Sequence, residues 1–148
     1  MSGVGLVYKF CKYIDKLLDV DYADEYLDLV SLGLIADMMD TREYETQVLI
    51  QQGLAKIKNP LFVELMRRDG MHFKDNKTPV MGDVAWYVAP VLNAVTRVGT
   101  MEEKVIVFEA LLEFMAYDQI PSTKRGCKGM TETRVEQAAR TAANVKSR

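Results

Sequence analysis

Residues that build metal, redox and membrane sites are scarce in this sequence. It has a single histidine, His72, and its two cysteines, Cys11 and Cys127, lie far apart. Ligands at the short spacings of zinc sites are therefore absent, and we expect reduced thiols. No tract approaches the roughly 18 consecutive apolar residues that span a bilayer. Because Lys9 and Lys12 interrupt the first apolar stretch, it does not resemble a signal peptide. We expect a cytoplasmic protein without a membrane partner.

Composition favours one ordinary globular domain. The chain has 148 residues, of which 49% are hydrophobic and 27% charged, with a net charge of −2. Residues 121–148 contain seven Lys/Arg and two Asp/Glu, a net charge of +5 that leaves −7 for residues 1–120. A basic tail on an acidic body favours nucleic-acid binding. A solvated helix with surplus lysines and arginines is an equally open interpretation.

Helical periodicity dominates the chain, and no segment alternates as a strand would. The fold class predicted is all-α, with about six to seven helices. Apolar residues at steps of three and four predict helices over residues 4–18, 21–35, 41–57, 84–98, 101–115 and 131–148, with a short one from Pro60. Residues 69–83 and the basic stretch 119–129 are expected to be loops.

Several local signals refine these helices. Thr100 and Glu103 have the spacing of a capping box, and so have Asp40 and Glu43. Trp86 lies in an apolar run, which favours a core position. The core-facing residues expected on the first helix and on the helix after Thr100 are Val7, Phe10, Cys11, Ile14, Leu17, Leu18, Val105, Phe108, Leu112 and Met115.

Asp37 has no such structural explanation. It follows the apolar run of the second helix, where a carboxylate faces the negative pole of the helix dipole. A carboxylate in apolar surroundings needs a cation or a donor. Periodicity alone favours an ordinary ion pair over a divalent metal, because His72 is the one imidazole available and a complete ligand set cannot be assembled.

Three stretches resemble RecJ-type single-stranded-DNA exonucleases of the DHH phosphoesterase superfamily. "SGVGLVYKF" resembles the turn and helix after the histidine motif, "LDLVSLGLIADMMD" the stretch with the last metal-binding aspartate, and "APVLNAVTRVG" the Asn, Ala and Arg pattern beyond the nuclease domain. The region after "PSTKRGCKG" resembles phage-type relatives. The resemblance implies that residues 1–55 end a DHH-type α/β nuclease domain, that 56–130 form a helical connector, and that 131–148 begin an interdomain helix.

The same resemblance assigns roles to residues. It implies that Asp37 binds manganese or magnesium and that Asn93 and Arg97 line the path of single-stranded DNA, although Arg97 could instead satisfy the last carbonyls of its helix. Phosphate contacts from the basic region are expected of Lys124, Arg125 and Lys128, and also of Arg134 and Arg140.

The family's Asp-x-Asp followed by glycine and its Asp-His-His are absent. We therefore expect an internal piece of a larger enzyme that lacks the N-terminal nuclease region and is inactive alone. Such a piece would leave an apolar face open and form a homodimer. The alternative is an autonomous helical module that binds nucleic acid or protein without catalysis, with Arg134 and Arg140 on its recognition helix.

Overall fold

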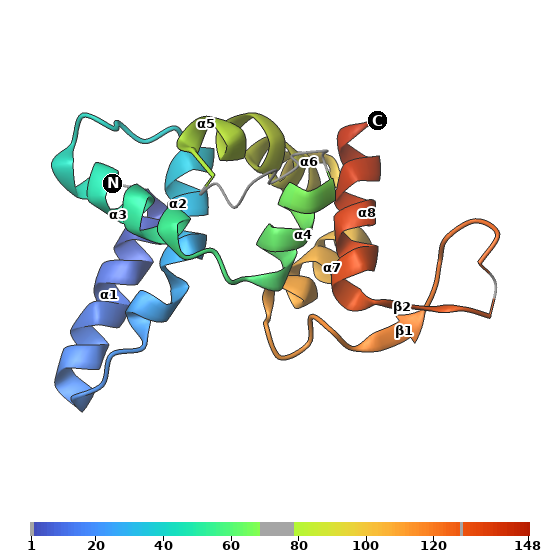
Figure 1. Ribbon diagram of the computed structural model, residues 1–148, viewed down its shortest axis with the longest axis horizontal. Coiled ribbons are helices and arrows are strands. Elements are labelled where there is room, and N and C mark those ends of the chain that lie inside the picture. Colours follow the sequence, from blue (N-terminus) through green and yellow to red (C-terminus); the bar gives the residue numbers. More distant parts are fainter. Residues whose placement is uncertain (1, 69–78, 128) are drawn as a thin grey trace. The chain divides into compact units, whose positions relative to one another are not determined.

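The computed structural model describes residues 2–68, 79–127 and 129–148, in two compact units. The first unit contains the described residues of 1–58 and 73–89, and the second those of 59–72 and 90–148. Length alone predicts one domain, so this division is a difference from the sequence interpretation. Helices dominate both units (Figure 1), which confirms the predominantly helical fold class.

The first unit is entirely helical in its described part. Its elements are α1 (Gly3–Leu18), the 3₁₀-helix η1 (Ala23–Tyr26), α2 (Leu27–Ala36), α3 (Tyr44–Ala55), the short α5 (Met81–Asp83) and the π-helix η2 (Val84–Val88). Helix α2 is central, with contacts to α1, η1, α3 and η2. Its apolar residues are buried on all sides, which is the pattern of a core helix.

Two glycines allow α2 to approach its neighbours closely. A Cβ on Gly33 would lie 2.6 Å from a methyl group of Val4 in α1, and one on Gly53 in α3 would lie 2.2 Å from the carbonyl oxygen of Leu27. Both distances are far below van der Waals contact. The absence of a side chain at these positions therefore sets the spacing of the three helices.

The apolar stripe predicted on the first helix is present but uncovered. Helix α1 forms as expected, and its N-cap is Ser2. Phe10 is 64% exposed, and Val7, Leu17 and Leu18 are similarly accessible. The side of α1 that meets α2 carries small residues such as Gly5 instead. The prediction that the large apolar residues face the core of this chain is therefore wrong.

Trp86 also differs from its predicted position, because its side chain is 77% exposed. The predicted helix over 84–98 is divided into η2 and α6 (Ala89–Val98). Pro90 accounts for the irregular geometry, since it has no N–H to continue the α-helical ladder. The Ala89 N–H bonds instead to the carbonyl of Val84, five residues earlier. This altered rotation separates exposed Trp86 from buried Val84 and Val88.

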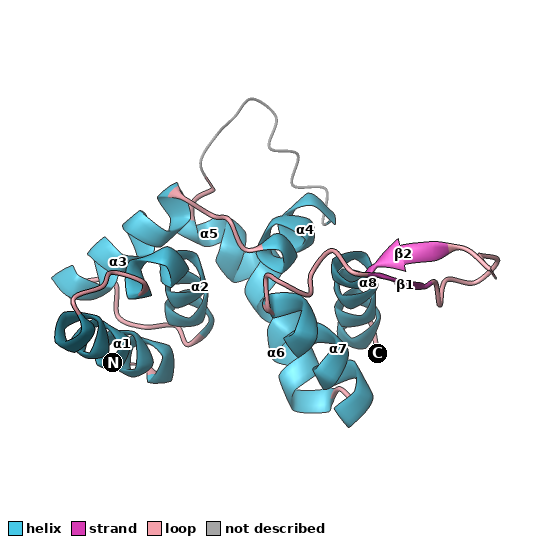
Figure 2. Cartoon of the chain, turned by 90° about the horizontal axis from the view of Figure 1, so that it is seen from below, coloured by secondary structure: helices cyan, strands magenta, loops and turns pink. Residues whose placement is uncertain are grey.

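The second unit combines helices with one small sheet. Its elements are α4 (Pro60–Arg68), α6, α7 (Met101–Leu111), β1 (Gln119–Pro121), β2 (Thr131–Thr133) and α8 (Arg134–Lys146). The two strands form a small hairpin (Figure 2). They pair antiparallel, with Ile120 opposite Glu132. The stretch predicted as a basic loop thus begins in β1, while residues 122–127 are loop as expected. Strands of three residues are too short to show an alternating pattern. None of the helices in the described residues is long and apolar enough to cross a membrane.

Helix α8 packs into the second unit rather than lying in solvent. It contacts α7 and α4, and Ala138, Ala139 and Ala142 are fully buried. Alanine permits this close packing, so the shortage of large apolar residues did not indicate an exposed helix. Its N-terminus has a capping box between Thr133 and Glu136, at a position two residues after the predicted helix start.

Local capping elsewhere in this unit follows the prediction. Thr100 and Glu103 form the expected box at the start of α7. Buried Asn59 caps α4: its Oδ1 accepts the backbone N–H groups of Leu61 and Phe62, and its Nδ2 donates to the Leu111 carbonyl. The asparagine thereby links the start of α4 to the end of α7.

The buried face of α7 differs from the prediction. Val107 and Ala110 are buried, whereas Phe108 is 64% exposed and Val105 is also accessible. Together with Leu92 and Val95 of α6, these two residues line an apolar groove of about 630 Å³. The second unit thus has an uncovered apolar surface of its own.

Candidate functional site

Asp37 is an exposed carboxylate at the C-terminal end of α2. It is the C-cap residue, and its backbone N–H bonds to the Gly33 carbonyl at 3.0 Å. The following residue, Met38, has a φ of 51° and is exposed. The expectation of apolar surroundings is therefore wrong. Among the described residues the Asp37 side chain has no hydrogen-bond or ion-pair partner, so the ordinary ion pair is not found either.

A complete metal centre is not formed by the described residues. They contain no group of three or more His, Cys, Asp or Glu side chains placed to hold one ion. His72 lies outside the described residues. Asp37 is therefore a single accessible oxygen donor, and its predicted role as a manganese or magnesium ligand requires further ligands from elsewhere.

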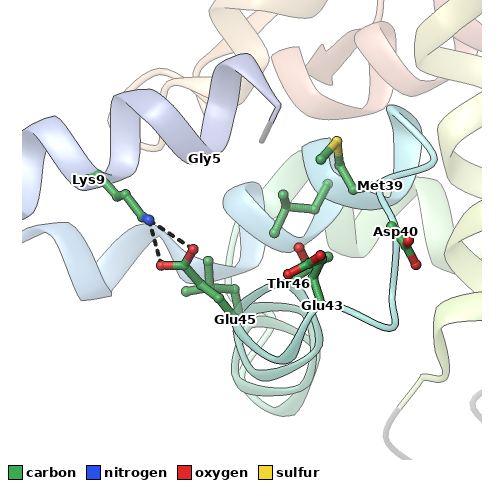
Figure 3. Close-up of a pocket in the computed structure, with 9 residues that line it drawn as sticks. Gly5, Lys9, Met39, Asp40, Glu43, Glu45 and Thr46 are labelled. Atoms are coloured by element: carbon green, nitrogen blue, oxygen red, sulfur yellow. Dashed lines mark hydrogen bonds and ion pairs between the residues drawn. The ribbon is translucent and has the colours of Figure 1, made fainter.

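A pocket of about 360 Å³ lies in the same unit, lined by Leu34 and Met39 and by the acidic residues Asp40, Glu43 and Glu45 (Figure 3). The Lys9 ammonium group of α1 pairs with Glu45 of α3 at 2.7 Å. This ion pair leaves Glu45 already neutralised, which does not favour cation binding in the pocket.

Asp40 does not cap α3, which corrects the predicted capping box. The N-cap of α3 is Glu43, and Asp40 instead accepts the backbone N–H of Arg42 at 2.9 Å. The Arg42 guanidinium also donates to both of its carboxylate oxygens. These hydrogen bonds lower the pKa of Asp40. The carboxylate is thus held by a local turn and a cation two residues away.

Asn93 and Arg97 lie four residues apart on α6, on one side of the helix. Asn93 is partly buried and Arg97 is exposed in the last turn. Among the described residues no hydrogen bond joins the Arg97 side chain to the helix-end carbonyls. The Val95 carbonyl is instead satisfied by the N–H of Gly99 at 3.0 Å. The guanidinium of Arg97 is therefore available to an external anion.

Lys124 and Arg125 lie at the tip of the β1–β2 hairpin, and both are exposed. The Lys124 carbonyl accepts the N–H of Cys127 at 3.1 Å, and Gly126 has a φ of 84°. This is the geometry of a type II turn, in which Arg125 occupies the outward position before the glycine. The Arg-Gly dipeptide was the sequence signal for this turn. Lys128, the third predicted cation, lies outside the described residues.

Arg134 and Arg140 of α8 are engaged within the unit, which corrects their predicted availability. Arg134 pairs with Glu109 of α7, and Arg140 lies 2.5 Å from Glu132 of β2. Their side chains are only 20% and 16% exposed. Ion pairs at this depth leave little of either guanidinium for DNA. The alternative of α8 as a recognition helix therefore loses its two principal cations.

Comparison with known proteins finds that most of this chain is similar to a segment of two longer curated proteins. Over 126 residues, 85% of the chain, it is 38% identical to YorK of Bacillus subtilis strain 168, derived from the SPbeta prophage, and to yorK of Bacillus phage SPbeta. The chain is similar to one part of these proteins. Both are named as proposed single-strand DNA-specific exonucleases, and the chain spans 21% of their length. No family model and no solved structure matches it.

Proposed function

We propose that this chain corresponds to a segment of a metal-dependent, RecJ-like single-stranded-DNA exonuclease and that it contacts the DNA strand within such an enzyme. The observation that carries this proposal is the 38% identity over 126 residues to the YorK proteins. Three accessible cations support a DNA-contacting role: Arg97 on α6 and Lys124 and Arg125 on the hairpin tip. Guanidinium and ammonium groups of this kind neutralise phosphates without reading bases.

Asp37 fits the role of one ligand in a metal centre completed by other parts of the enzyme. Its carboxylate is exposed and has no partner among the described residues, and hard divalent cations prefer such oxygen donors. A manganese or magnesium ion supplies an activated water and charge neutralisation for phosphodiester hydrolysis. One carboxylate cannot hold such a centre by itself, so the chain alone is proposed to be inactive.

Paramagnetic NMR tests the ligand role without requiring activity. Manganese titrated into the isolated chain is expected to broaden the amide signals of Asp37 and Met38 first, at millimolar concentrations that reflect a single donor. Asp37→Asn should abolish this local broadening while the other signals stay in place. Broadening that persists in Asp37→Asn, or that never reaches this region, would contradict the ligand role.

A nuclease assay tests inactivity. The purified chain with manganese is expected to leave a 5′-labelled single strand intact. Degradation by the wild-type chain that disappears in Asp37→Ala would overturn the proposal that catalysis needs further ligands, because a single contaminating nuclease would not respond to this substitution.

Fluorescence anisotropy with a labelled oligonucleotide tests the DNA-contacting role. We expect weak binding that falls with salt, and Lys124→Ala/Arg125→Ala should lower the slope of log affinity against log salt by about 1.4, two contacts at ~0.7 each. The matched control is Lys16→Ala/Lys56→Ala, which removes the same charge from two exposed positions of the first unit. Equal losses in both variants would indicate non-specific attraction and contradict a hairpin interface.

A further inference from the structure

The hairpin is attached to α8 by one buried carboxylate. Glu132 of β2 is only 4% exposed. Its Oε1 accepts the backbone N–H of Thr123 at 3.0 Å and an N–H of the Arg140 guanidinium at 2.5 Å. A charged hydrogen bond in such a setting is stronger than a neutral one. Glu132 therefore joins both arms of the hairpin to the helix.

Thr123 provides a second attachment at the same point. Its Oγ1 accepts from Arg140 at 3.0 Å and lies 3.5 Å from the Gln137 amide nitrogen. Both the backbone and the side chain of Thr123 are thus held by α8 or by its partner Glu132. The next two residues along the chain are Lys124 and Arg125, so the attachment lies directly before the exposed cations.

Lys124 is close to Glu132 but forms no hydrogen bond with it. Its ammonium nitrogen is 3.9 Å from Glu132 Oε2, beyond hydrogen-bond distance, and that oxygen has no hydrogen bond among the described residues. The ammonium hydrogens of Lys124 are therefore not taken by Glu132 and can be donated to another anion.

We propose that Glu132 and Arg140 are positioning residues for DNA binding: they hold the hairpin so that Lys124 and Arg125 are presented together to neighbouring phosphates. This inference rests on the proposed function. It predicts the direction in which DNA affinity changes when the charge of Glu132 is removed. Removing a negative charge close to the DNA would strengthen binding if only long-range electrostatics mattered, whereas loss of positioning weakens it.

The test compares Glu132→Gln with Glu102→Gln by anisotropy on a single-stranded oligonucleotide. Both variants remove one negative charge from the second unit, but exposed Glu102 lies outside the hairpin attachment. Glu132→Gln is expected to bind about five- to tenfold more weakly with a shallower salt slope, while Glu102→Gln binds equally or slightly better. Equal or tighter binding by Glu132→Gln would overturn the inference.

A second variant guards against misfolding of Glu132→Gln. Thr123→Val removes the Oγ1 acceptor at an exposed position without changing the charge. It should weaken binding about threefold, and unchanged affinity would contradict the positioning role. Hydrogen exchange of the Thr123 amide, which donates to Glu132, reports the attachment independently of DNA and should accelerate in Glu132→Gln. Wild-type protein that fails to bind DNA overturns the proposed function, whereas unchanged exchange overturns the attachment itself.

Discussion

Gly53 of α3 lies directly against the backbone of Leu27 in α2: a Cβ at position 53 would stand 2.2 Å from the Leu27 carbonyl oxygen. Ser31, one turn further along α2, is also close, with its Cβ 2.6 Å from the same point. A flexible side chain could move aside, but a helix backbone cannot do so without shifting α2. This contact therefore fixes the separation of the two central helices.

Gly53→Ala is expected to lower the free energy of unfolding by about 1 kcal/mol, because an overpacking cost of ~1–3 kcal/mol exceeds the ~1 kcal/mol gained in helix propensity. The measurement is urea unfolding followed by circular dichroism. Gly3→Ala is the matched control, since nothing lies within 4 Å of a Cβ at the first residue of α1. Equal stability of Gly53→Ala and wild type would contradict the close packing of α2 and α3.

Loss of the carboxylate charge is expected to have opposite effects on the stability of the fold at Asp37 and at Asp15. Asp37 is exposed at a helix C-terminus, where its charge opposes the dipole, so Asp37→Asn should be neutral or stabilising. Asp15 is buried and accepts the N–H groups of Tyr22 and Ala23 at 3.0 and 2.7 Å. Asp15→Asn should destabilise by about 1–3 kcal/mol, because an amide cannot replace both acceptor bonds at full strength.

Thermal unfolding of the two variants at neutral pH checks this contrast. A destabilised Asp37→Asn would indicate that the carboxylate has a structural partner and would weaken its assignment as a ligand for an external ion. Neutral or raised stability of Asp37→Asn would show that folding does not depend on this carboxylate.

Local signals in the sequence predicted much of the helical structure. The box at Thr100 and Glu103 depends on residues three apart, and the helix start at Asn59-Pro60 depends on proline chemistry, so both were accessible without knowledge of the tertiary fold. The capping box at Asp40 had the same spacing but is not formed. A nearer cation, Arg42, bonds the carboxylate into a tight turn before α3 begins.

Burial was less predictable because it depends on which elements meet. The periodicity of α1 and α7 located an apolar stripe but did not show which side of the helix is covered. The buried residues are Gly5 and Asp15 in α1 and Val107 and Ala110 in α7. The predicted core position of Trp86 was wrong for the same reason, because its side chain is exposed. The hairpin was missed because its three-residue strands are too short to alternate, and the engagement of Arg134 and Arg140 depends on acidic residues distant in sequence.

The exposed stripe on α1 leads to a prediction about association. Phe10 and Leu17 are among several large apolar side chains that are about two-thirds exposed on one helix, which is more than isolated surface residues require. Within a larger exonuclease we propose that this stripe packs against the remainder of the enzyme. In the isolated chain it should bind a second copy, so light scattering at high concentration is expected to give the mass of a dimer.

Phe10→Lys tests whether α1 is the contact, because a charge in the centre of the stripe should return the chain to the mass of one copy. Phe114→Lys is the matched control: Phe114 is another exposed phenylalanine, at 80%, and lies in the second unit beyond the end of α7. It should remain dimeric. A single-copy mass for the wild-type chain would exclude this association. Dissociation by Phe114→Lys alone would place the contact elsewhere, because an apolar stripe that drives pairing must be sensitive to a buried charge at its own centre.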